Sequence, residues 1–93
     1  MKFICPSIGE GHERDFLVCG SIDEFKIIVF SSLEEYEEGL KHMDLSDYTP
    51  CEVSLELFKE LSKNDDAFSG IILNMHNENK HVDKNEIMEE SFF

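Results

Sequence analysis

Cysteine and histidine are the residue types in this chain that could hold a metal ion. The cysteines are Cys5, Cys19 and Cys51, and the histidines are His12, His42, His76 and His81. Small zinc domains pair two closely spaced cysteines with two histidines three to five residues apart. His76 and His81 have four residues between them, but the sequence contains no Cys-x-x-Cys pair and no His-Glu-x-x-His motif. We therefore expect no metal ion and no other cofactor.

A cysteine nucleophile needs a neighbouring base that removes its proton. Cys19 lies in an apolar segment and Cys5 precedes Pro6, so we expect both side chains to be buried. Cys51 is followed by Glu52 and is expected to be exposed, where the carboxylate disfavours the thiolate. All three are interpreted as free thiols, and the protein is predicted not to be an enzyme.

The charge of the chain is strongly negative. Twenty-one aspartates and glutamates against eight lysines and arginines give a net charge of −13 in 93 residues. Nucleic acids and anionic membranes are bound by clustered Lys and Arg, so neither is an expected partner. A basic protein would be attracted, and its association would slow as salt rises. The alternative interpretation is that the acidity serves solubility alone.

The densest group of carboxylates is a run of four glutamates within five positions. The predicted partner-binding residues are Glu34, Glu35, Glu37, Glu38, Asp65 and Asp66. Neighbouring carboxylates repel one another, and a basic partner would relieve that repulsion. The alternative is a solvated helix face, because the helix dipole stabilises carboxylates near a helix N-terminus.

The hydrophobic patterns that must position these residues predict an α+β fold. Strands are expected over residues 2–6, 15–20, 25–30 and 71–74, with shorter extended pieces at 49–53 and 81–82. Helices are expected from residue 33 to beyond residue 40, over 55–62, and from Asp83 onward. The order predicts a small antiparallel or mixed sheet of about four to five strands packed with two to three helices. Residues 1–90 are expected to form this single domain, and residues 91–93 a C-terminal tail with two phenylalanines.

Several boundaries follow from individual residue types. Pro6 is expected to end the first strand, and Ser31 or Ser32 to cap the first helix. Strand 25–30 is apolar on both faces and is therefore expected at the centre of the sheet. The first helix is expected to turn an apolar stripe toward the sheet. That stripe is Leu33, Tyr36, Leu40 and Met43.

Two short motifs resemble a known family. The segment VFSS at 29–32, followed by an acidic helix, resembles the VFTS signature of the SseB-like N-terminal domain family, named for enhanced serine sensitivity. The segment GIILN at 70–74 resembles a GIVLNP-like strand of that family, and VDKNEI at 82–87 resembles its closing turn into a helix. The resemblance covers roughly residues 1–88. It implies an α+β fold with a binding role, because the family is not tied to a defined enzymatic activity.

These features together predict a non-enzymatic domain that binds a basic protein. An inhibitor or immunity-type protein directed against a toxin or nucleic-acid-handling protein fits the size and the charge. Two alternatives are a self-associating module, such as a homodimer, and a small-molecule or metal-binding domain. The N-terminal segment MKFICPSIGE lacks the apolar core of a signal peptide, and no apolar run approaches the ~20 residues of a membrane span. We therefore expect a cytoplasmic protein without membrane contact.

Overall fold

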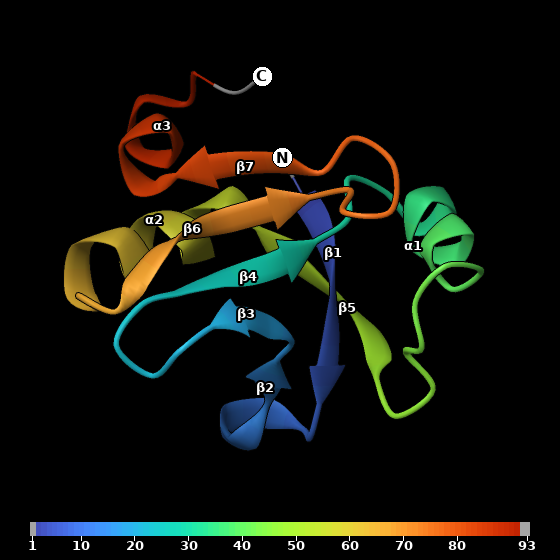
Figure 1. Ribbon diagram of the computed structural model, residues 1–93. Helices are drawn as coiled ribbons and strands as arrows, with labels where there is room; N and C mark the ends of the chain where they lie inside the picture. The colour runs from blue at the N-terminus through green and yellow to red at the C-terminus, as the bar shows by residue number, and fades with distance from the viewer. Residues whose placement is uncertain (1, 92–93) are drawn as a thin grey trace.

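The computed structural model describes residues 2–91, apart from the side chain of His12. These residues fold into two sheets and three α-helices (Figure 1). The first sheet is antiparallel with the order β2-β1-β5, formed by Asp15–Phe16, Lys2–Ile8 and Thr49–Ser54. A short 3-10 helix, Gly11–Glu13, lies between β1 and β2. The two phenylalanines of the predicted tail, Phe92 and Phe93, lie outside the described residues.

The second sheet is mixed and has the order β3-β4-β6-β7. Its strands are Val18–Gly20, Phe25–Val29, Phe68–Leu73 and Lys80–Asp83. Strands β4 and β6 are parallel neighbours, and the other two pairs are antiparallel. The crossover between β4 and β6 contains helix α1 (Leu33–Gly39), strand β5 and helix α2 (Leu55–Asn64). Because the pair is parallel, residues that follow β4 and residues that precede β6 lie at opposite ends of this sheet.

Helices cover both faces of strand β4. Ile27 and Val29 pack with Phe58 of α2 and with Ile87 of α3, which spans Lys84–Glu89. The side chains that alternate with them, Ile28 and Phe30, pack with Tyr36 of α1. The structure confirms the predicted α+β fold and the central position of this strand. Burial on both faces is the physical reason for its uninterrupted apolar sequence.

The prediction that Pro6 ends the first strand is wrong, because β1 continues to Ile8. Pro6 stands opposite Pro50 of β5, and its carbonyl accepts a hydrogen bond from the Leu17 backbone N at 3.1 Å. In an antiparallel pair, alternate residues direct their backbone polar groups away from the partner strand. Both prolines occupy such positions, so neither removes a hydrogen bond between β1 and β5.

The predicted strand 15–20 is two strands in different sheets. The break is at Leu17, whose N donates to Pro6 in the first sheet and whose carbonyl accepts from Ile28 N at 3.0 Å in the second. A second link between the sheets joins Ile4 and Phe30, which exchange two backbone hydrogen bonds of 2.9 and 2.7 Å. The two sheets are therefore tied together by backbone hydrogen bonds as well as by side-chain packing.

Helix α1 begins as predicted but ends early. The Ser32 Oγ accepts a hydrogen bond from Glu35 N at 3.2 Å, and the helix ends at Gly39. Leu33 and Leu40 are expected to face the sheet, yet these side chains are 51% and 46% exposed. Of the expected stripe, only Tyr36 is fully buried. A helix of only two turns places one of these positions directly against the sheet.

Candidate functional site

The acidic surface predicted on α1 is only partly available to a partner. Glu34 and Glu37 are exposed, and within the described part of the chain neither side chain makes a hydrogen bond or an ion pair. Glu38 pairs with Lys41 at 3.1 Å. Glu35 turns toward the loop after β6, where its Oε2 accepts from Asn77 Nδ2 at 3.0 Å. Two of the four glutamates therefore already have partners inside the molecule.

The inward contact of Glu35 is with a buried imidazole. Its Oε2 lies 2.9 Å from Nε2 of His76, whose side chain is 1% exposed. The ring of His76 stacks on His42 with centroids 6.2 Å apart and packs on Phe30 at 5.5 Å. Neither ring nitrogen has a hydrogen-bond partner of good geometry. His76 therefore buries its side chain although it lies in a polar turn.

Asn74 joins the end of β6 to the start of α1. It is 2% exposed, and its Oδ1 accepts from Ser31 N at 3.0 Å. Its Nδ2 donates to Ser31 Oγ and to Glu78 Oε1, each at 3.0 Å. The backbone at Asn74 has a φ of 50°, a left-handed conformation that asparagine tolerates better than most residues. This residue positions both segments that carry Glu35 and His76.

Asp65 and Asp66 do not join the glutamates of α1 in one surface. They precede β6, whereas α1 follows β4, so the two acidic groups lie at opposite ends of the sheet. Asp65 Oδ1 also accepts a hydrogen bond from Ala67 N at 3.0 Å, which stabilises the turn after α2. Asp66 is exposed. The six predicted residues are therefore two separate groups.

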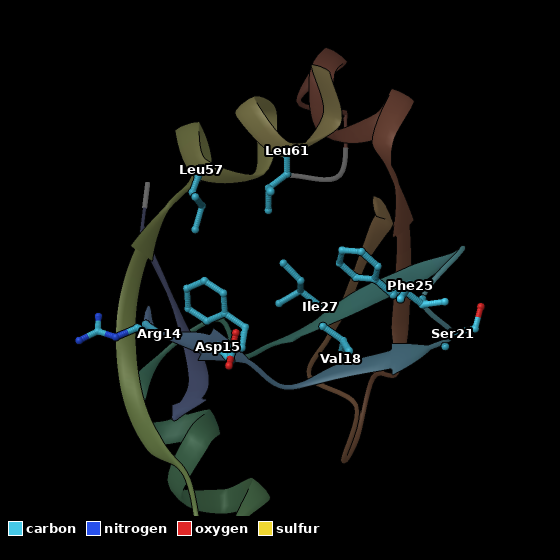
Figure 2. Close-up of a pocket in the computed structure, with 11 residues that line it drawn as sticks. Arg14, Asp15, Val18, Ser21, Phe25, Ile27, Leu57 and Leu61 are labelled. Atoms are coloured by element: carbon cyan, nitrogen blue, oxygen red, sulfur yellow. The ribbon is translucent and has the colours of Figure 1, made fainter. Parts of the chain in front are cut away.

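The most distinct concave feature is an apolar groove of about 630 Å³ between α2 and β3 (Figure 2). Leu57 and Leu61 point into it from α2, and Phe25 and Ile27 line its opposite side from β4. The remaining lining residues come from β2, β3 and their surroundings: Arg14, Asp15, Phe16, Val18, Gly20, Ser21 and Ile22. The volume lies within the range of natural ligand pockets.

Part of the groove lining is open to solvent. Val18 is 45% exposed and Ile22 is 90% exposed. Asp15 is the carboxylate in the lining, and the exposed Asp23, Glu24 and Glu60 are sequence neighbours of lining residues. The Arg14 guanidinium in the lining donates from Nη1 to Cys51 Sγ at 2.7 Å. The lining is therefore mainly apolar, with one acidic and one basic residue.

Cys5 is buried as predicted, whereas Cys19 and Cys51 lie differently from the prediction. Cys19 is exposed, whereas Cys5 and Cys51 are buried opposite each other in β1 and β5. Burial, and secondarily the neighbouring Cys51, raises the pKa of the Cys5 thiol far above its ordinary value. A thiol that stays protonated is a poor nucleophile. Cys19 faces outward because β3 is an edge strand, which the apolar sequence around it did not reveal.

No cluster of three or more metal-ligating side chains occurs among the residues that the structure describes. The side chain of His12, one of the candidate ligands, lies outside that set. His42 and His76 stack face to face, an arrangement in which their nitrogens do not converge on a point between them. In residues 2–91, no helix has the length and apolar character needed to cross a bilayer.

Comparisons of the chain with protein-family models, with curated proteins and with solved structures find no match. The resemblance to the SseB-like family therefore stays a prediction.

Three residues of the sequence indicate the groove. Helical spacing predicts Leu57, Phe58 and Leu61 as one buried stripe of α2, but of these only Phe58 is fully buried. Leu57 and Leu61 lie on the flank of α2 and are only partly buried. The isolated Ile22 between Ser21 and Asp23 is the third, because an apolar side chain in a polar turn has no core to enter.

Proposed function

We propose that this protein is a non-enzymatic protein-binding domain whose basic partner contacts the apolar groove between α2 and β3. The groove is the observation that supports this most, because protein interfaces commonly combine an apolar centre with a polar rim. Ile22 lines the groove and is 90% exposed, so much of this apolar side chain faces solvent. A protein partner that covers the groove would bury that apolar surface.

The charge of the partner follows from the rim and from the whole chain. Asp15 lines the groove, Asp23, Glu24 and Glu60 are exposed sequence neighbours of lining residues, and the chain has a net charge of −13. Such a field attracts a basic protein over a distance of about 10 Å at moderate salt. The exposed Glu34 and Glu37 add to this field from the other face of the sheet. An inhibitor or immunity-type role against a nucleic-acid-handling protein or toxin fits, because carboxylates then take the places of phosphates.

The test begins with capture of partners from native lysate at low salt and continues with the purified partner. Its Kd is then measured by calorimetry at 50 and 300 mM NaCl, for the wild type and for Ile22→Asp. Ile22 is almost fully exposed, so the substitution leaves the core unchanged. We expect Ile22→Asp to weaken binding at least about tenfold, although it adds a charge that a basic partner would favour. The higher salt is expected to weaken binding at least about fivefold.

Leu33→Asp on α1 is the matched control, since Leu33 is 51% exposed and lies away from the groove. It should leave the Kd within about twofold, as surface changes outside an interface do. An empty capture, a partner that is not basic, or equal binding by Ile22→Asp and wild type would contradict the proposal.

A further inference from the structure

We infer that the occupant of the groove is an extended segment of a basic partner that adds to the open edge of β3 as a new strand. This inference rests on the proposed protein-binding function and specifies how binding occurs. It needs a free strand edge, a side-chain register that directs residues into the groove, and a charge that selects the segment. Each of these is present in the described residues.

The edge of β3 has backbone groups that face away from the sheet. Leu17 O accepts from Ile28 N at 3.0 Å, and Ser21 N donates to Glu24 O at 2.8 Å, so residues of this parity face β4. Antiparallel pairing alternates, and Val18 and Gly20 therefore direct their N–H and C=O groups outward. All three residues of β3 are exposed, which leaves these groups accessible to a further strand.

The other three edge strands are protected in the usual way, by charge or by proline. Strand β2 contains Asp15, β5 contains Pro50 and Glu52, and β7 contains Lys80 and Asp83. Strand β3 has the sequence Val-Cys-Gly, with neither a charge nor a proline, and only its length of three residues limits pairing with a further strand. An edge without charge or proline beside an apolar groove is suited to accept a short extended segment.

The register places an added strand over the groove. Val18 pairs with Ile27, and Gly20 pairs with Phe25, so the side of β3 that carries Val18 is the side that lines the groove. Alternate side chains of an added strand would extend the face from which Val18 lines the groove. Gly20, with a φ of 129°, adds no side chain to that face.

The charge of the whole chain selects the remaining positions of the segment. Apolar residues at every second position would face the groove, and the intervening side chains would meet solvent on the opposite face of the sheet. The net charge of −13 favours Lys or Arg at those positions. The expected ligand is thus an extended segment that alternates apolar and basic residues.

The test uses a phage-displayed library of random twelve-residue peptides, selected on the full chain at 50 mM NaCl. We expect selected peptides to alternate apolar and basic residues. The strongest binder is then synthesised with a single N-methyl group at each amide in turn. N-methylation should weaken binding at least about tenfold at two residues separated by one, which would donate to the Val18 and Gly20 carbonyls, and less than about twofold elsewhere, because only alternate amides of a strand face its neighbour. Val18→Lys, which places a charge on the edge, should also weaken binding about tenfold or more.

Other outcomes would overturn the inference in distinguishable ways. Peptides that are sensitive to Ile22→Asp but tolerate N-methylation everywhere would bind the groove without adding a strand, which leaves the proposed function standing. A library without enriched binders would overturn strand addition, while the captured partner still decides the function. A wild-type dimer in light scattering that Val18→Lys converts to a monomer would assign the edge to a second copy of this chain instead.

Discussion

Replacing Asn74 by aspartate should destabilise the fold in a pH-dependent manner. The substitution keeps the size of the side chain and its tolerance of a left-handed backbone, with φ at 50°. It removes the Nδ2 donor that serves Ser31 Oγ and Glu78 Oε1, each at 3.0 Å. In its place stands a second carboxylate beside that of Glu78, in a side chain that is 2% exposed in the wild type.

The magnitude follows from these contacts. A hydrogen bond to a charged group contributes about 1.5–3 kcal/mol, and one between neutral groups about 1 kcal/mol. Repulsion between the introduced carboxylate and that of Glu78 would add about 1 kcal/mol, because Glu78 is exposed and water screens its charge. Ser31 can reorient its hydroxyl to donate, which offsets part of the loss. For Asn74→Asp we expect the free energy of unfolding to fall by about 2–4 kcal/mol at pH 7.5.

Burial and the neighbouring Glu78 would raise the pKa of the new carboxyl group in the folded state above its unfolded value of about 3.9. At pH values between the unfolded and the folded pKa of this group, the folded variant binds more protons than the unfolded chain. The free energy of unfolding of the variant, relative to wild type, therefore falls as pH rises. The deficit should therefore be smaller at pH 5.5 than at pH 7.5, by about 1 kcal/mol or more.

Urea unfolding followed by far-ultraviolet circular dichroism measures both quantities, and the chain has no tryptophan to serve as a fluorescent probe. Asn79→Asp is the matched control, because Asn79 also has a positive φ, 48°, but is exposed in the same turn. That variant should lose less than about 0.5 kcal/mol. A deficit for Asn74→Asp below about 1 kcal/mol, or one equal at both pH values, would refute the reasoning.

Three further predictions concern backbone and thiols. Gly70→Ala should cost at least about 3 kcal/mol in urea unfolding, since φ is 146° and a Cβ would overlap the Val82 carbonyl oxygen; Gly11→Ala, which meets nothing within 4 Å, should cost about 1 kcal/mol, and equal losses would contradict this. A colorimetric thiol reagent should modify exposed Cys19 at least about a hundredfold faster than the two buried thiols, and uniform rates would show that the core opens readily. Burial raises the pKa of Cys5 in the folded state, so the thiol's contribution to the free energy of unfolding is complete below the unfolded pKa of about 8.5. Above that pH the contribution is lost at up to about 1.4 kcal/mol per pH unit. Cys5→Ala should remove this loss of stability at high pH, and an equal pH dependence in the variant and the wild type would contradict the prediction.

The sequence by itself determined the elements of this fold where the pattern was local. Residues apolar on both faces predict strand β4 as central, and the structure confirms this. The Asp83–Glu86 capping box at the start of α3 is also confirmed, since capping depends on residues only three positions apart.

Tertiary structure alone decided features that depend on distant partners. Pro6 is compatible with β1 because the register with β5 places it where no hydrogen bond to that strand is made. That register pairs Pro6 with Pro50, 44 positions away, which no local rule contains. The predicted strand is broken at Leu17 because its N–H hydrogen-bonds to one sheet and its C=O to the other. Cys19 is exposed because β3 lies at a sheet edge, and strand order is set by the whole topology.

The candidate site divides in the same way. Composition predicted an acidic, partner-binding surface, but a count of carboxylates does not say which of them make contacts within the molecule. The fold turned Glu35 toward His76 and separated Asp65 from α1. The groove between α2 and β3 could not be predicted, because it forms where two distant apolar flanks approach without filling the space between them. The order of amino acids decides which side chains are apolar, whereas only packing decides which of them remain uncovered.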